Sequence, residues 1–396
     1  MDQSAQPASH LMKGLRRLVK DIRVSSTVNG SGLTDVVCGT TSLLSFGDSA
    51  VSYCGQSIDE LTEQPSFERV LWLLLHQSLP TEEELADSCS IMADSAVIDQ
   101  SALEMMSHLP LSTRPLDVFP LCILLLSFFD PTPQDSSPDA CRSRILRLLA
   151  QLPMILSAGF DDTFEESRLR PTGISPDETE LSWAGRLLHR LRRSNERPTA
   201  AEDSAMNTLM ICQCLTEMRP ACFTARFAAS ATTHILAALQ SAATVFVSQL
   251  RNDPYLWTSE LLNNFRDPGQ AEAWWRRREG QPMPFGFSNS NDDQRAGILA
   301  ETVLTLLGST DRIRIAGCAA RLEKVLATDL FFPTADWVST KVMTLLDIPP
   351  ERQSIVIGMA RLVGWSAQAI EQQASGLSLL PRLNYGETGS ADESQW

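Results

Sequence analysis

The first candidate for chemistry in this sequence is an arginine at the end of an apolar helix. Residues 245–257 read VFVSQLRNDPYLW, where the apolar pattern ends and Arg251 stands beside the turn-forming run Asn252-Asp253-Pro254. A guanidinium group is a permanent cation with several hydrogen-bond donors, because its pKa lies above about 12. Arg251 could therefore hold a carboxylate or stabilise an enolate, but it could not deliver a proton.

The cysteines look like packing residues. They number nine and stand in apolar stretches, such as Cys122 in PLCILLL, which is typical of buried free thiols. This usage predicts a reducing compartment. Cys212 and Cys214 form a CxC pair with no second pair of ligands at zinc spacing, so we predict core packing and no metal site.

The five histidines are also spread along the chain, at His10, His76, His108, His189 and His234. His234 is the strongest candidate for a ligand. It falls in the middle of an apolar helical pattern, where a histidine is more often a core or interface residue. His76 ends an apolar helix and is expected to be a cap or a surface residue.

Length and charge limit the class of protein. The chain has 396 residues, enough for one large or two unequal domains. A net charge of -15 argues against a nucleic-acid partner, because binding phosphates needs a basic surface.

The one basic cluster, residues 10–23, predicts a solvated N-terminal helix. The alternative is a transit peptide or a membrane-surface helix, and the acidic residues Asp2 and Asp21 weaken it. The longest apolar run, residues 118–129, is too short to cross a bilayer. We predict a cytoplasmic protein, or a mitochondrial-matrix one if the chain is eukaryotic, with no membrane partner.

The apolar spacing predicts a mainly α-helical chain. Strand-like alternation is confined to residues 34–55, which predicts one small hairpin region. From Ser66 onward the spacing is helical, with Ser66 and Glu68 as start signals for one helix and Thr81, followed by three glutamates, for another. The segment 221–250, rich in Ala, Ser and Thr, predicts one long buried helix that another helix can approach closely.

Several stretches taken together resemble the citrate synthase and 2-methylcitrate synthase family, in family order over about residues 32–386. An alternating hairpin with the turn Tyr53-Cys54-Gly55-Gln56 comes first. The next stretch is similar to the helix that pairs across the family's dimer, and it reads FTARFAASATTHILAALQSAATVF. The last stretch is similar to the family's late pattern of Pro-x-x-Asp, Ala-Arg and Gly-Trp, and it reads LFFPTADWVSTKVMTLLDIPPERQSIVIGMARLVGW.

The resemblance implies a fold with two helical domains. We expect an N-terminal tail or helix over 1–30 and a large helical domain formed by 31–250 with 334–382. A small helical domain is expected over 251–333 and a C-terminal tail over 383–396. A ligand pocket is expected in the cleft between the two domains.

The resemblance also implies a Claisen-type condensation of an acyl-CoA with a 2-oxo acid. In the family an aspartate removes a proton from the acyl methyl group, and histidines stabilise the enolate and polarise the carbonyl. By position, Asp336 is the base and Arg361 binds a carboxylate. The two histidine positions hold Arg251 and Phe287 instead. The resemblance therefore implies a condensation scaffold with a degenerate active site.

The remaining family positions can be assigned in the same way. Substrate binding falls on Gln213 and Thr216, and on Arg382, since the first arginine of a family Arg-Pro-Arg is Leu380 here. Binding of coenzyme A falls on Arg295. No permanently bound cofactor is expected, and acetyl-CoA or another acyl-CoA is the possible ligand.

Three functions stay open at this point. The chain is a catalytically impaired relative that acts as a partner subunit or binds a small dicarboxylate or an acyl-CoA; or it is an active synthase with altered groups; or it is an α-helical interaction scaffold. A homodimer, or a heterodimer with a relative that keeps the histidines, is expected. We also expect Arg251 to pair with Asp336 in the absence of ligand.

Overall fold

The computed structural model describes residues 33, 36–47, 50–110, 112–158, 173–192, 196–232, 234–277 and 283–381. Contacts divide the chain into a short unit, residues 1–40, and a compact unit, residues 41–396. The described residues form sixteen α-helices and five short strands, which confirms the mainly α prediction. The basic helix predicted over 10–23 lies outside the described residues.

The predicted hairpin is a three-stranded antiparallel sheet of β1 (Leu44–Phe46), β2 (Val51–Tyr53) and β3 (Gln56–Ser57), in that order. The turn between β2 and β3 has positive φ at both Cys54 (49°) and Gly55 (81°), as a tight two-residue hairpin turn requires. The buried Tyr53 hydroxyl donates to the carbonyl of Ile211 at 3.0 Å. This bond attaches the sheet to the helix that precedes the cavity described below.

Two of the helices that follow begin at the predicted residues. The Ser66 side chain accepts from the amide of Arg69, and Thr81 forms a reciprocal capping box with Glu84. This part contains α2 (Ile58–Glu63), α3 (Phe67–His76), α4 (Glu82–Ser95), α5 (Gln100–Ser107), α6 (Pro115–Ser127), α7 (Pro138–Ala158), the 3-10 helix η2 (Pro176–Glu178), α8 (Trp183–Leu191) and α9 (Ala200–Cys214).

The prediction of one helix over 221–250 is wrong. The segment forms two helices, α10 (Pro220–Ala231) and α11 (Ile235–Gln249), which pack against each other. Thr232 is extended (φ -135°, ψ 148°), and its hydroxyl accepts from the amide of His234 at 3.2 Å. A β-branched residue whose side chain offers the backbone this local bond competes with the helix and ends it.

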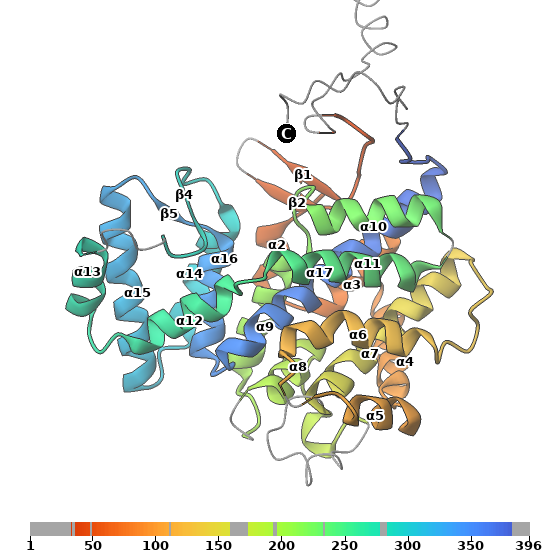
Figure 1. Cartoon of the computed structure of the whole chain (residues 1–396), viewed down its shortest axis with the longest axis horizontal. Coiled ribbons are helices and arrows are strands. Elements are labelled where there is room, and N and C mark those ends of the chain that lie inside the picture. Colours follow the sequence, from red (N-terminus) through yellow and green to blue (C-terminus); the bar gives the residue numbers. More distant parts are fainter. Residues whose placement is uncertain are drawn as a thin grey trace, which may run out of the picture. The chain divides into compact units, whose positions relative to one another are not determined.

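The later elements are α12 (Pro254–Asn264), α13 (Pro268–Arg276), β4 (Phe287–Ser288), α14 (Gln294–Thr305), α15 (Thr310–Thr328), β5 (Phe332–Pro333), α16 (Ala335–Leu345) and α17 (Pro350–Ser375). Figure 1 shows α13, α14, α15 and the β4–β5 pair gathered at one side of the unit. The boundaries of the two expected domains stay a prediction.

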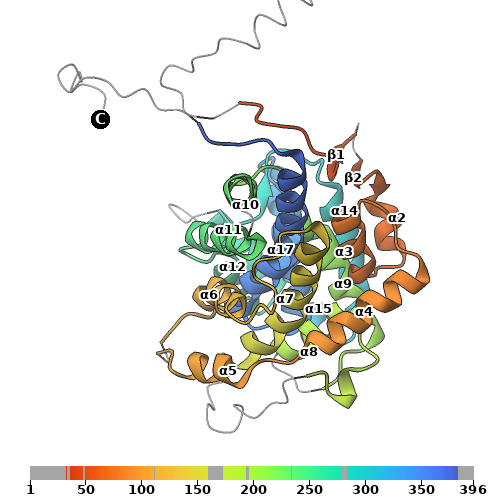
Figure 2. The same ribbon diagram turned by 90° about the vertical axis from the view of Figure 1, so that its right-hand side faces the viewer.

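Helix α17 runs through the middle of the compact unit and packs on α3, α6, α7, α9, α10, α11, α12 and α16 (Figure 2). Eighteen of its residues, from Gln353 to Gln372, are buried. A Cβ atom added to Gly364 would lie 2.0 Å from the carbonyl oxygen of Cys214. Glycine therefore permits a backbone-to-backbone contact between α17 and the end of α9.

All nine cysteines are free, and six of them are buried. Within the described residues no helix is long and apolar enough to span a membrane, and no cluster of three or more metal-binding side chains occurs.

We expect the half-buried Cys54 to react slowly with iodoacetamide near neutral pH. Burial and, to a lesser extent, the Glu371 carboxylate raise the pKa of the Cys54 thiol to about 11. At about pH 8 the thiolate fraction of Cys54 is roughly two hundredfold below that of an ordinary thiol. Because a thiolate of higher pKa is the stronger nucleophile, the rate regains about tenfold of this loss. The rate should be about twentyfold slower than in urea and rise nearly tenfold per pH unit up to about pH 10. Site-resolved mass spectrometry measures it; a plateau near pH 9 would contradict the assignment.

Candidate functional site

A cavity of about 510 Å³ brings together segments that are far apart in the sequence. It is lined by the β1–β2 hairpin, residues 213–219 at the end of α9 and beyond, residues 285–295 before and at the start of α14, residues 334–336 at the start of α16, and Arg361 of α17. Six predicted site residues line it: Gln213, Thr216, Phe287, Arg295, Asp336 and Arg361. Both expected domains contribute to its walls.

The carboxylate of Asp336 is almost fully enclosed, with 11% of its side chain exposed. Its Oδ1 accepts from the Tyr255 hydroxyl at 2.7 Å and from Nη2 of Arg361 at 2.9 Å, and its Oδ2 lies 3.5 Å from Nη1 of Arg219. Asp336 also stands in the first turn of α16, where the helix dipole favours a negative charge. Burial alone would raise the pKa of Asp336, but Arg361, Arg219 and the Tyr255 hydroxyl outweigh it and hold the pKa below its ordinary value.

Arg361 is buried, with 8% of its side chain exposed. Besides Asp336, its Nη2 lies 3.3 Å from both the Tyr255 hydroxyl and Oε1 of Gln213, and its guanidinium stands 5.6 Å from the centre of the Phe246 ring. Burial would lower the pKa of Arg361, but Tyr255 and Asp336 reverse this effect and raise the pKa. Arg361 is therefore a buried cation in the cavity wall that is bonded through Nη2, while its buried Nε has no hydrogen-bond partner among the described residues.

Gln213 is held in one orientation by two polar partners. Its carbonyl oxygen accepts from Arg361, and its amide donates to Oγ of Ser339 at 2.9 Å. Thr216, which is almost fully buried, donates to the carbonyl of Glu217 at 3.3 Å. The predicted substrate-binding pair is thus in the cavity, with Gln213 linked to the predicted carboxylate-binding arginine.

Arg295 makes polar contacts with two neighbouring residues. Its Nε lies 3.1 Å from Oδ1 of Asp293, and its Nη1 is 3.5 Å from the carbonyl oxygen of Leu215. Burial would lower the pKa of Arg295, but Asp293 and Tyr53 raise it. The other oxygen of Asp293 accepts from the amide of Ala335 at 2.8 Å. Asp293 therefore joins the starts of α14 and α16.

Two phenylalanines form an aromatic wall. The Phe287 ring lies 4.6 Å from Trp337, and the Phe285 ring makes an edge contact with Tyr255 at 4.9 Å. Gly286 between them has φ +85° and accepts from the Thr334 amide at 2.8 Å. A Cβ at position 286 would lie 2.3 Å from the backbone nitrogen of Trp337, so the wall is pressed against α16.

The expected ion pair between Arg251 and Asp336 is wrong. Arg251 is exposed after the end of α11, is not among the described residues that line the cavity, and accepts from Arg114 through its backbone carbonyl at 3.1 Å. Asp253, with φ 34°, caps α12 by accepting from the Leu256 amide. This turn leaves Arg251 on the surface and directs Tyr255 inward. Arg382 lies outside the described residues.

Sequence reasoning missed Arg219 and Tyr255. Arg219 precedes Pro220 at the start of α10, and its side chain is 47% exposed while it faces Asp336. Tyr255 is one of only three tyrosines and follows the turn that the sequence marks with Asp253-Pro254. The position of Tyr255, a polar aromatic residue directly after a turn, could have indicated a site residue. No sequence feature of this kind marks Arg219.

The four histidines within the described residues lie away from the cavity walls. His76 stacks on Trp72 at 3.7 Å at the end of α3. His108 and His189 contact the carbonyl oxygens of Glu104 and Glu196. The expected place of His234 in the middle of a helix is wrong, because it is the N-cap of α11.

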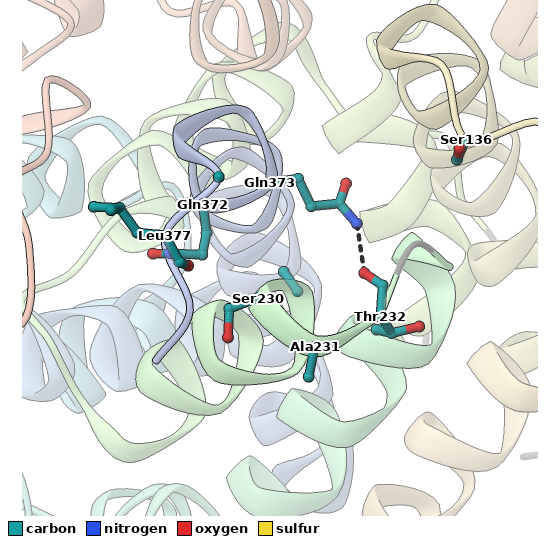
Figure 3. A pocket seen from close by; sticks show the side chains of 9 residues that line it. Ser136, Ser230, Ala231, Thr232, Gln372, Gln373 and Leu377 are labelled. Carbon is teal, nitrogen blue, oxygen red and sulfur yellow. Dashed lines mark hydrogen bonds between the residues drawn. The ribbon is translucent and has the colours of Figure 1, made fainter. Parts of the chain in front are cut away.

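A second cavity, of about 410 Å³, lies at the ends of α10 and α17 (Figure 3). The amide of Gln373 donates to the carbonyl of Thr232 at 3.0 Å across it. The described residues that line it are serine, alanine, threonine, glutamine, glycine and leucine. These side chains hold no charge and cannot act as acid or base, so the first cavity is the better candidate site.

Solved structures define the fold class. The citrate synthase of Thermoplasma acidophilum, in a ternary complex with carboxymethyl coenzyme A and oxaloacetate, is 18% identical with a TM-score of 0.76, covering 91% of this chain and 96% of that one. The citrate synthase of Thermotoga maritima is 21% identical with a TM-score of 0.73, covering 91% and 97%. The fold is the all-α fold of the citrate synthases.

The sequence comparison establishes the family. Residues 32–382 match the family model described as citrate synthase, C-terminal domain, so the chain belongs to the citrate synthase family. Citrate synthase 2 of Bacillus subtilis is 26% identical over 362 residues, 89% of this chain and 95% of that protein. The 2-methylcitrate synthase of Mycobacterium tuberculosis is 26% identical over 365 residues, 89% of each chain.

Proposed function

We propose that this chain binds a carboxylic acid in the Asp336 cavity and has lost most of the condensation activity of its family. The observation that carries the proposal is the environment of Asp336, a buried carboxylate held by Arg361, Arg219 and the Tyr255 hydroxyl. No histidine is among the described residues that line the cavity.

The arrangement disfavours proton abstraction from carbon. A general base works best with a pKa near the operating pH, and the pKa of Asp336 is held below its ordinary value. Phe287 can neither donate a hydrogen bond nor carry charge. Because each lost oxyanion donor costs roughly 10²–10³ in rate, a site without histidines should condense very slowly.

The same arrangement favours binding of an anion. Arg219 is half exposed and its Nη1 lies 3.5 Å from Oδ2 of Asp336, so it can turn toward an incoming carboxylate while Arg361 keeps Asp336 in place. A small dicarboxylate or an acyl-CoA is the starting candidate, since a relative of the same fold was solved with carboxymethyl coenzyme A and oxaloacetate.

The alternative function is an active citrate or 2-methylcitrate synthase, as the names of the relatives suggest. In that case Asp336 is the base, and the half-exposed Arg219 beside it stabilises the enolate. The second alternative, an interaction scaffold, needs no ligand in the cavity. In all three cases we place the protein in a reducing compartment such as the cytoplasm, because its nine thiols are free.

We also propose that the chain acts as a dimer, with itself or with a relative that keeps the histidines. Helices α6 and α11 pack together, and exposed apolar side chains follow each other on α6 and at its C-cap: Leu121, Leu124 and Phe128, the last 69% exposed. Apolar side chains exposed in one stripe beside a small-residue helix are typical of an interface. Light scattering at micromolar concentration measures the mass, and a stable monomer would contradict the dimer.

The binding proposal is tested by titration calorimetry with oxaloacetate and by an assay of coenzyme A release from acetyl-CoA. We expect binding of oxaloacetate, weakened about tenfold in Arg219→Gln because a charged hydrogen bond is lost, and release at least about 10²-fold slower than in an ordinary synthase. Arg251→Gln is the matched control, since it removes an arginine outside the cavity, and it should leave both readouts unchanged. Ordinary turnover would establish the enzyme, and absence of any binding would favour the scaffold.

A further inference from the structure

We propose that Arg219 exchanges partners when an acid binds: it pairs with Asp336 while the cavity is empty and with the carboxylate of the ligand when the cavity is occupied. The inference rests on the proposed acid-binding function and concerns the regulation of that same site. Three observations carry it: the loose contact between Arg219 and Asp336, the separate bonds that hold Asp336, and the unpartnered Nε of Arg361. As a consequence, Asp336 becomes a stronger base only in the presence of bound acid.

The contact between Arg219 and Asp336 is loose. Nη1 of Arg219 lies 3.5 Å from Oδ2 of Asp336, which is longer than the roughly 2.7–2.9 Å of a charge-assisted hydrogen bond. The Arg219 side chain is 47% exposed, whereas that of Arg361, which holds the other carboxylate oxygen at 2.9 Å, is 8% exposed. Because water screens an exposed ion pair, Arg219 can leave Asp336 at little cost.

Asp336 does not depend on Arg219 for its position. Its Oδ1 accepts from the Tyr255 hydroxyl at 2.7 Å and from Nη2 of Arg361 at 2.9 Å. Its backbone belongs to the first turn of α16, where the amide of Ala335 donates to the Asp293 carboxylate at 2.8 Å. Asp336 therefore stays in place when Arg219 turns away, but it loses one neighbouring cation.

Arg361 offers the ligand a second donor. The bonds of Arg361 to Asp336, Gln213 and Tyr255 all use Nη2, and its buried Nε has no hydrogen-bond partner among the described residues. Arg361 also lines the cavity. A buried donor without a partner costs free energy, so a carboxylate that reaches this Nε is favoured. The acid is thus held by one fixed donor, Nε of Arg361, and by one movable donor, Arg219.

The exchange changes the charge around Asp336. Burial raises the pKa of Asp336, and four groups lower it: Arg361 of α17, Arg219 before α10, the Tyr255 hydroxyl of α12 and Arg295 of α14. The cavity wall also holds carboxylates, at Glu217, Asp292 and Asp293. When Arg219 pairs with a ligand that itself brings negative charge, the pKa of Asp336 rises. Acid binding is therefore linked to proton uptake, so the affinity should increase as the pH falls.

A double-mutant cycle on the affinity for oxaloacetate tests the exchange, by titration calorimetry on the full chain near neutral pH. If the ligand and Asp336 compete for Arg219, Asp336→Asn should tighten binding. Arg219→Gln, expected to weaken binding about tenfold in the wild type, should then weaken it about thirtyfold or more in the Asp336→Asn background. Asp292→Asn is the matched control, since it removes a lining carboxylate that is bonded to Ser290. The effect of Arg219→Gln should stay within about twofold in that background.

A second measurement keeps the test decisive if Asp336→Asn does not fold. From about pH 7.5 to pH 5, where the ligand carboxyls stay mostly ionised, the affinity of the wild type should rise about twofold to tenfold. Arg219→Gln should lose most of this rise, and Arg219→Lys, which keeps the cation, should retain it.

The outcomes separate the exchange from the binding. An equal or smaller effect of Arg219→Gln in the Asp336→Asn background would overturn the exchange and leave the acid-binding function standing. If that variant does not fold, an equal pH dependence of the wild type and Arg219→Gln would do the same. Absence of oxaloacetate binding by the wild type would overturn both.

Discussion

Arg361→Met is expected to lower the free energy of unfolding by about 3–5 kcal/mol. The substitution keeps much of the side-chain volume but removes the buried cation that faces Asp336 at 2.9 Å. Asp336 would keep the Tyr255 hydroxyl and the half-exposed Arg219, which is too far and too solvated to replace the lost bond. Urea unfolding followed by circular dichroism at neutral pH measures the change.

Two controls separate the loss of the ion pair from the loss of packing. Arg219→Met removes the more exposed partner of the same carboxylate and should cost less than about 1 kcal/mol. The double variant Asp336→Asn with Arg361→Met removes both charges and should recover a large part of the loss. If Arg361→Met stayed within about 1 kcal/mol of the wild type, the pair would not contribute to stability as proposed.

Gly364→Ala is expected to cost about 3 kcal/mol or more, or to prevent folding. The new Cβ would lie 2.0 Å from the carbonyl oxygen of Cys214 and 3.1 Å from its carbonyl carbon, and a backbone group cannot turn away as a side chain can. Helices α9 and α17 would have to separate. Since Gln213 at the end of α9 contacts Arg361 of α17 at 3.3 Å, the same separation should also weaken acid binding.

Gly297→Ala is the matched control. Gly297 lies within α14, and a Cβ there would meet nothing within 4 Å. We expect a gain of about 0.5–1 kcal/mol, because alanine loses less backbone freedom on folding than glycine does. Thermal and urea unfolding of the two variants should therefore move in opposite directions, and an equal effect of both substitutions would exclude the contact with Cys214 as the cause.

The proposed acid binding and the proposed loss of condensation rest on the same arrangement of charged groups around Asp336. A buried aspartate flanked by two arginines is stabilised as a carboxylate, which makes it a weak base and a fixed point for the cations around it. Phe285 and Phe287 give the cavity wall an apolar surface.

Local features of this protein were determined by the sequence alone. Ser66 and Thr81 start their helices because their hydroxyls accept the otherwise unpaired amides of the first turn. Gly55 allows the left-handed turn of the hairpin, and the apolar spacing from residue 66 onward predicts the helices. The motifs PTADW and MARLVGW, by their resemblance to the family, also indicated that Asp336 and Arg361 belong to one site.

Only the tertiary structure decided which side chains meet in the cavity. The positive φ of Asp253 leaves Arg251 on the surface and directs Tyr255 to Asp336, and no local pattern specifies that direction. Arg219 stands at the start of α10 and Asp336 in the first turn of α16, so their approach to 3.5 Å depends on how these elements pack. Hydrogen bonds within a turn depend on neighbouring residues, which a sequence displays, whereas the meeting of side chains 81 or 106 positions apart depends on how whole helices pack.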